Sequence, residues 1–170
     1  MRGGLRAAGP RARDARLKEH VLRREQWLAR TATDVFPFFA DAGNLARITP
    51  PDLRFAFETE LPVDMRVGAH IDYRLSLYRV PFRWRTRITA WDPPHSFVDE
   101  SVRSPYRLWE HSHWFRPAED GSRRTLMVDQ VRYALPFAPF GEIAHFLVRR
   151  KLDQIFDYRR QVVEQLFGSD

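Results

Sequence analysis

The chain has 170 residues, 44% of them hydrophobic, and its 13 Phe, 5 Trp and 5 Tyr suffice for one packed core. It contains no cysteine, which excludes a disulfide framework, a thiolate metal site and a cysteine nucleophile. The formal net charge of +6 suits nucleic-acid binding only if the charge lies on the folded part.

The basic charge is concentrated at the N-terminus. Residues 1–18 carry six basic side chains against Asp14 alone, so they hold +5 of the +6 and leave +1 for the rest. We therefore expect no specific nucleic-acid surface. The composition predicts a disordered basic tail over 1–18 and a single domain over 19–168. No stretch is apolar enough for a signal core or a membrane span, so the expected location is cytoplasmic.

The domain is predicted to begin with a strand and two short helices. Residues 20–29 mix apolar and charged side chains in the manner of a strand. Cap-type residues at 31–34 precede an apolar run and indicate a helix start. A second helical turn over 44–48 ends before Pro50 and Pro51, because proline disfavours helix in the residue before it.

Six further strands are predicted from the period-two alternation of apolar and polar residues. Turn residues separate them, including an Asp-Gly pair at 120–121. The expected strands cover residues 53–57, 71–77, 82–89, 97–103, 108–116 and 125–135.

A long helix is predicted from about residue 139 to the end of the chain. Its apolar stripe follows steps of three and four residues through Phe140, Ile143, Ala144, Leu147, Lys151, Ile155, Tyr158, Val162 and Leu166. The charged residues between these positions are expected on a solvated face, namely Arg149, Arg150, Arg159, Arg160 and Glu164.

This order of elements predicts an α+β fold. Strands in a plain meander pair antiparallel, and a helix of that length buries its stripe only against the sheet. A curved sheet of about six to seven strands must then wrap around the C-terminal helix. Such an arrangement leaves room between sheet and helix for a small apolar ligand.

Several local runs, together with the order of elements, resemble the SRPBCC superfamily, which includes START, Bet v 1, polyketide cyclase and coenzyme Q-binding proteins. The runs are Trp91-Asp92-Pro93-Pro94-His95-Ser96-Phe97-Val98-Asp99-Glu100, Pro105-Tyr106, Trp109-Glu110-His111-Ser112-His113, Phe115, Leu135-Pro136-Phe137 and Phe156-Asp157-Tyr158-Arg159. The likeness covers roughly residues 19–167. It implies a helix-grip fold with a hydrophobic pocket, and it leaves the chemistry open because one fold hosts many functions.

An unusual polar constellation lies in the strand over 108–116. Strand periodicity places four of its residues on one face: Trp109, His111, His113 and Phe115. A turn centred on residues 104–105 pairs positions whose numbers sum to about 210, and a sum near 242 applies across the following loop. A tight two-residue turn at 120–121 would shift that second register by one residue.

These registers bring histidines and carboxylates together. Asp99 is expected opposite His111, Phe97 opposite His113, and Asp129 opposite His113 on the next strand. In one interpretation, Asp99 holds His111 and Asp129 holds His113 as satisfied buried pairs. In a second, the imidazoles orient a carbonyl or hydroxyl group of a ligand. In a third, Asp99 orients His111 as a general acid or base.

The same residues are adequate ligands for zinc or iron, but the resemblance does not support a metal, and we expect neither metal nor cofactor. The expected function is to bind or carry a hydrophobic small molecule such as a lipid, isoprenoid, quinone or polyketide. A cyclase- or dehydratase-like enzyme using His111 and Asp99 is the alternative, and the oligomeric state stays open. The predicted ligand-binding residues are Tyr73, Leu75, Leu77, Trp84, Asp99, Tyr106, Trp109, His111, His113, Asp129, Phe140 and Phe146.

Overall fold

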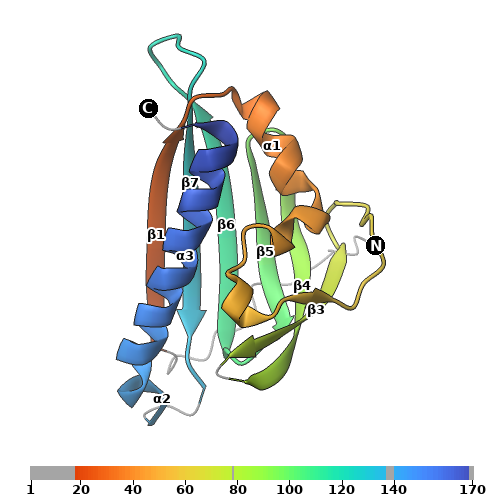
Figure 1. The fold of residues 1–170 in the computed structure, drawn as a ribbon, viewed down its shortest axis with the longest axis vertical. Coiled ribbons are helices and arrows are strands. Elements are labelled where there is room, and N and C mark those ends of the chain that lie inside the picture. Colours follow the sequence, from red (N-terminus) through yellow and green to blue (C-terminus); the bar gives the residue numbers. More distant parts are fainter. Residues whose placement is uncertain (1–17, 78, 137–139, 169–170) are drawn as a thin grey trace, which may run out of the picture.

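A curved antiparallel sheet frames the molecule in the computed structural model, which describes residues 18–77, 79–136 and 140–168 (Figure 1). In the described residues the sheet has seven strands in the spatial order β1-β7-β6-β5-β4-β3-β2. The strands are β1 (Glu19–Leu28), β2 (Ala56–Phe57), β3 (His70–Leu77), β4 (Val80–Asp92), β5 (Ser96–Arg103), β6 (Leu108–Pro117) and β7 (Thr125–Ala134). Every neighbouring pair is antiparallel, so the predicted meander is confirmed, and β1 joins it beside β7.

Along the sequence of the described residues, three helices precede β2 and two follow β7. They are α1 (Ala32–Ala40), the 3-10 helices η1 (Ala42–Ala46) and η2 (Pro51–Leu53), α2 (Phe140–Ile143) and α3 (His145–Phe167). The predicted tail lies outside the described residues, apart from Lys18. No helix in the described ranges is both long enough and apolar enough to cross a bilayer.

The expected strand over 53–57 is shorter than predicted, because only Ala56–Phe57 pairs with β3. Prolines at 50 and 51 start the 3-10 turn η2 instead, and a proline at the first helical position loses no hydrogen bond. Arg54 then adopts a left-handed conformation with φ 46°, which ends the turn.

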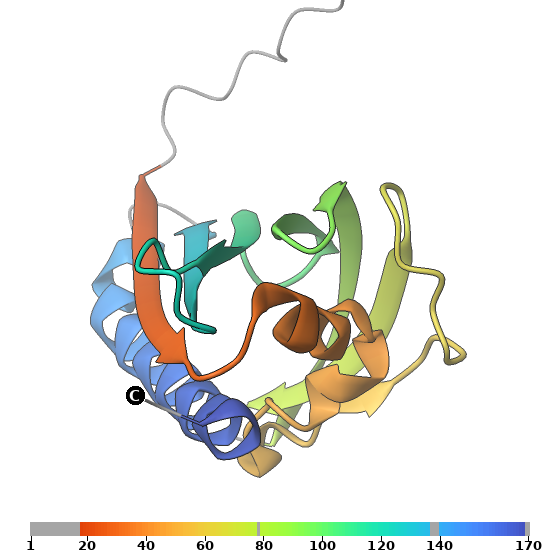
Figure 2. The same ribbon diagram turned by 90° about the horizontal axis from the view of Figure 1, so that it is seen from above.

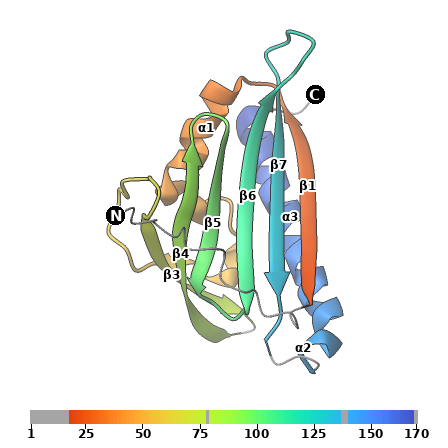
Figure 3. The same cartoon turned by 180° about the vertical axis from the view of Figure 1, so that it is seen from behind.

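The sheet bends so that one face is concave. Figure 2 shows the strands curling around α1 and α3, and Figure 3 shows the opposite face of the sheet without a covering helix. Irregularities in the β4–β5 register after Arg85 and after Ile88 accompany the bend, since an extra residue kinks a strand and increases its twist. This curvature gives α3 a surface to dock on while holding β3 and β4 away from it.

The buried face of α3 differs from the predicted stripe by about one residue. The structure buries Leu152, Phe156, Arg159 and Val163. Apolar residues stand in adjacent positions, as in Ile155-Phe156 and Val162-Val163, so two overlapping stripes fit the same sequence. Docking on the sheet selects the stripe that contains Arg159, and the expectation that this arginine is solvated is wrong.

An aromatic cluster anchors α1 against the sheet. Phe115 of β6 is fully buried, and its ring centroid lies 5.4 Å from that of Phe36 and 5.2 Å from that of Phe39. Phe97 joins them with its ring 6.4 Å from Phe115. The contacts are those of a close-packed core, so the end of the molecule that carries α1 is filled.

Candidate functional site

A cavity of about 230 Å³ lies between the concave face of the sheet, the α1-to-η2 segment and α3. Aromatic rings supply much of its wall: Phe38, Phe39, Phe55, Tyr73, Phe82, Trp84, Phe97, Tyr106, Trp109 and Phe156. Aliphatic residues of the strands, of η1 and η2, and of α3 complete it. An apolar wall of this kind favours a ligand with an apolar body, because burial of apolar surface drives binding.

Two polar atoms of the aromatic wall bond to the same threonine hydroxyl. The indole N–H of Trp84 donates to the Thr86 hydroxyl at 3.1 Å, and the Tyr73 hydroxyl lies 3.3 Å from the same oxygen. Burial raises the pKa of the Tyr73 hydroxyl, so it stays protonated. This part of the cavity therefore presents ring faces to a ligand.

A second part of the wall is polar and deeply buried. The register matches the predictions: Asp99 of β5 faces His111 of β6, Phe97 faces His113, and His113 faces Asp129 of β7. The side chains of His111 and His113 are 8% and 3% exposed, so each imidazole must find its partners within the protein.

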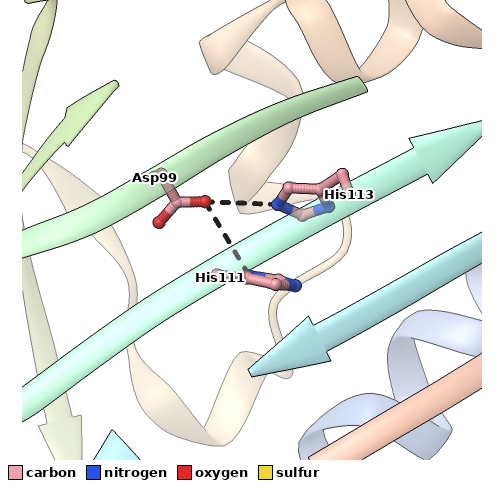
Figure 4. A group of neighbouring side chains, drawn as sticks. All are labelled: Asp99, His111 and His113. Atoms are coloured by element: carbon pink, nitrogen blue, oxygen red, sulfur yellow. Dashed lines mark hydrogen bonds and ion pairs between the residues drawn. The ribbon is translucent and has the colours of Figure 1, made fainter. Parts of the chain in front are cut away.

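The one-to-one pairing of the first interpretation is replaced by a shared one: both imidazoles lie within 4 Å of Asp99 (Figure 4), and both lie within 4 Å of Asp129. His113 Nε2 lies 3.2 Å from Asp99 Oδ2, and His111 Nε2 lies 3.1 Å from Asp129 Oδ1. The remaining ring nitrogens face the opposite carboxylates, with His113 Nδ1 2.7 Å from Asp129 and His111 Nδ1 3.8 Å from Asp99. The ring centroids are 3.8 Å apart, so both imidazoles fit between the two carboxyl groups.

Arg159 of α3 completes the cluster, and the sequence prediction missed it. Its Nε lies 3.3 Å from Asp129 Oδ2, and its Nη2 lies 3.3 Å from His113 Nδ1. The guanidinium also lies 5.5 Å from the centroid of the Phe39 ring. The available signal was charge balance, because two carboxylates predicted on a buried face require a cation nearby.

The surroundings shift the pKa values of two members of the cluster. Burial and the neighbouring His113 imidazole lower the pKa of His111 to about 4, so its ring is neutral at pH 7. Burial opposes ionisation of Asp129, but Arg159 and the hydrogen bonds from both imidazoles outweigh it and hold the pKa of this carboxyl well below its usual range. The Asp129–Arg159 pair therefore carries both charges.

Most predicted site residues line this cavity: Tyr73, Leu75, Leu77, Trp84, Asp99, Tyr106, Trp109, His111 and His113. Asp129 lies behind the imidazoles. Phe146 is 70% exposed on the outer side of α3, so its expected place in the wall is wrong, again because the stripe is displaced. The side chain of Phe140 lies outside the described part of the chain.

The sequence prediction also missed the helical wall of the cavity. Phe38, Leu45 and Ile48 reach it from α1 and from the η1 segment. Lys151 of α3 lies at its edge and donates to Asp52 of η2 at 2.5 Å, which links the two elements across the cavity. In the sequence, an apolar residue of the cavity wall cannot be told from an ordinary core residue. Only the fold shows that these residues face the cavity.

Comparison of the sequence with protein-family models and with curated proteins finds no match. Solved structures do match. The ZhuI aromatase/cyclase from Streptomyces sp. R1128 has a TM-score of 0.67 at 13% identity, over 86% of this chain and 92% of that one. A protein from Thermus thermophilus has a TM-score of 0.66 at 18% identity, over 86% of this chain and 95% of that one.

A third match is norcoclaurine synthase from Thalictrum flavum, in complex with dopamine and hydroxybenzaldehyde. Its TM-score is 0.62 at 16% identity, over 97% of this chain and 98% of that one. These likenesses extend over nearly the whole length of each relative and share the curved sheet gripping a C-terminal helix. The chain therefore has the Bet v 1-like helix-grip fold.

Proposed function

We propose that the protein binds a small hydrophobic molecule in the cavity between its sheet and α3, with one polar oxygen of the ligand directed at the His111–His113 wall. The single observation that carries this proposal is the cavity itself, about 230 Å³ and lined largely by aromatic rings. A packed protein interior has few voids larger than a water molecule, and an apolar cavity of this kind can take up a small apolar molecule.

The arrangement of polar groups supports a ligand with an oxygen at one end. Asp99, His111 and His113 reach the cavity from one wall, whereas Tyr73 and Trp84 of the aromatic wall bond to Thr86. A few placed polar groups in an apolar pocket orient a ligand. The solved relative with dopamine and hydroxybenzaldehyde, both small oxygen-bearing aromatics, is consistent with this use of the fold. The lack of cysteine suits a reducing, cytoplasmic location.

Calorimetric titration with 2-naphthol and with naphthalene tests this proposal. Both compounds offer the same apolar rings, and only 2-naphthol carries a hydroxyl for the polar wall. We expect one 2-naphthol per chain and roughly tenfold weaker binding of naphthalene, because a hydrogen bond to a charged group contributes about 1.5–3 kcal/mol. Failure of both compounds to bind contradicts the proposal, and equal affinity removes the role of the polar wall.

A second candidate function is acid–base catalysis of a cyclase or dehydratase type. His111 favours it, because Nε2 is fixed by Asp129 while Nδ1 lies 3.8 Å from Asp99, too far for a hydrogen bond. Asp129 fixes this imidazole with Nδ1 as the acceptor, and its lowered pKa of about 4 restricts it to accepting a proton from a strongly acidic group of the substrate. With a turned-over substrate, His111→Gln is expected to lower kcat far more than it changes KM. An unchanged kcat excludes this chemistry.

A further inference from the structure

The side chains of Asp99, His111 and His113 converge on one point of the cavity wall (Figure 4). Asp99 Oδ2 lies 3.2 Å from His113 Nε2 and 3.8 Å from His111 Nδ1, and all three atoms lie within 4.8 Å of one another. Ligand atoms that surround a metal ion at about 2.1 Å are themselves roughly 3.0–3.5 Å apart. The Asp99–His113 distance falls in this range, and the Asp99–His111 distance is slightly longer.

Asp129 lies against the outer nitrogens of both imidazoles. His111 Nε2 is hydrogen-bonded to Asp129 Oδ1 at 3.1 Å, and His113 Nδ1 lies 2.7 Å from the same oxygen and 3.3 Å from Arg159 Nη2. A metal-bound histidine donates its other ring N–H to a carboxylate in this manner, which fixes the ring and its tautomer. Arg159 fixes that carboxylate in turn, at 3.3 Å from Asp129 Oδ2.

The cluster also contains the groups that a cation site uses. Two carboxyl side chains, Asp99 and Asp129, and the guanidinium of Arg159 meet at the imidazoles, and the carboxyl side chains are only 16% and 8% exposed. A cation at the point where Asp99 meets the two imidazoles would contact the Asp99 carboxylate directly.

We propose that Asp99, His111 and His113 form a mononuclear site for a divalent transition metal ion, zinc or iron(II), with Asp129 and Arg159 as positioning residues. Two imidazoles and one carboxylate suit these ions and not magnesium or calcium, which prefer oxygen ligands. Three protein ligands leave the cavity side of the ion open to a ligand oxygen. This site goes beyond the binding of a hydrophobic molecule, which the naphthalene-type titration tests on metal-free protein.

The test uses the untagged full-length chain, stripped with EDTA and titrated with zinc chloride by calorimetry. We expect one zinc ion per chain and no binding of magnesium under the same conditions. Asp99→Asn removes a ligand and is expected to weaken zinc binding by roughly 100-fold or more, whereas Asp129→Asn costs about 10- to 100-fold through loss of orientation. Circular dichroism establishes that each variant is folded.

His145→Ala is the matched control, because His145 and His20 stack at 3.7 Å beside Glu142 and offer a rival surface site. This variant is expected to bind zinc as the unaltered chain does. Loss of binding in His145→Ala, or equal binding in Asp99→Asn, overturns the proposal and makes the zinc adventitious. If Asp99→Asn does not fold, X-ray absorption at the zinc edge of His145→Ala decides, because the rival site then has only one imidazole: two imidazole ligands support the site, and none or one contradicts it.

Discussion

Replacement of Arg159 by methionine is expected to lower the free energy of unfolding by about 3–5 kcal/mol. The guanidinium is the cation nearest the buried Asp129 carboxylate in the described part of the chain, and its removal leaves that charge without compensation. Methionine keeps the apolar stem that packs near Phe39 and Phe156. Urea unfolding followed by tryptophan fluorescence measures the change.

Two companion variants separate charge from packing. Arg160 is exposed on the neighbouring position of α3, so Arg160→Met is expected to change the same quantity by less than about 0.5 kcal/mol. The double variant Arg159→Met/Asp129→Asn carries no uncompensated carboxylate. Its free energy of unfolding should therefore fall by less than that of Arg159→Met alone. If Arg159→Met costs no more than Arg160→Met, the buried ion pair has no role in stability.

Substitution of Ile155 by tryptophan is expected to abolish binding of 2-naphthol, with an affinity loss of roughly 100-fold or more. Ile155 lines the cavity from α3, and a larger side chain there occupies the space that the ligand needs. Gln154→Trp is the matched control, because this neighbouring residue is exposed and the added ring lies in solvent. Calorimetric titration compares the three proteins, and Gln154→Trp should stay within about twofold of the parent.

The stability of Ile155→Trp tests independently whether the interior at this position is open. Overpacking of a filled core costs about 1–3 kcal/mol, whereas a side chain that enters an existing cavity costs little. We therefore expect Ile155→Trp to unfold at nearly the same urea concentration as the parent. A large loss of stability together with unchanged 2-naphthol binding would mean that the interior at Ile155 is already filled and that the ligand lies elsewhere.

The sheet could be predicted from the sequence because its signals are local. Period-two alternation located the strands of the meander, and the turns set the registers that place Asp99 opposite His111 and Asp129 opposite His113. A side chain on a strand has only two faces to choose from. The sequence was therefore enough to predict that these histidines and carboxylates lie together.

The face of α3 could not be predicted in the same way. Apolar side chains at Ile155 and Phe156 point about 100° apart, and either can start a buried stripe. The choice depends on a distant partner, since Asp129 lies on β7 and attracts Arg159 across the core. The hydrogen-bond pattern of the imidazoles was also out of reach, because it depends on ring tilt and on this arginine.

Native mass spectrometry of the full-length chain, purified without organic solvent, tests the central claim that α3 and the sheet enclose a ligand cavity. The account predicts a mass above that of the bare chain by one small molecule, released on organic extraction, or uptake of one 2-naphthol by the extracted protein. A bare-chain mass both before and after addition of 2-naphthol contradicts it.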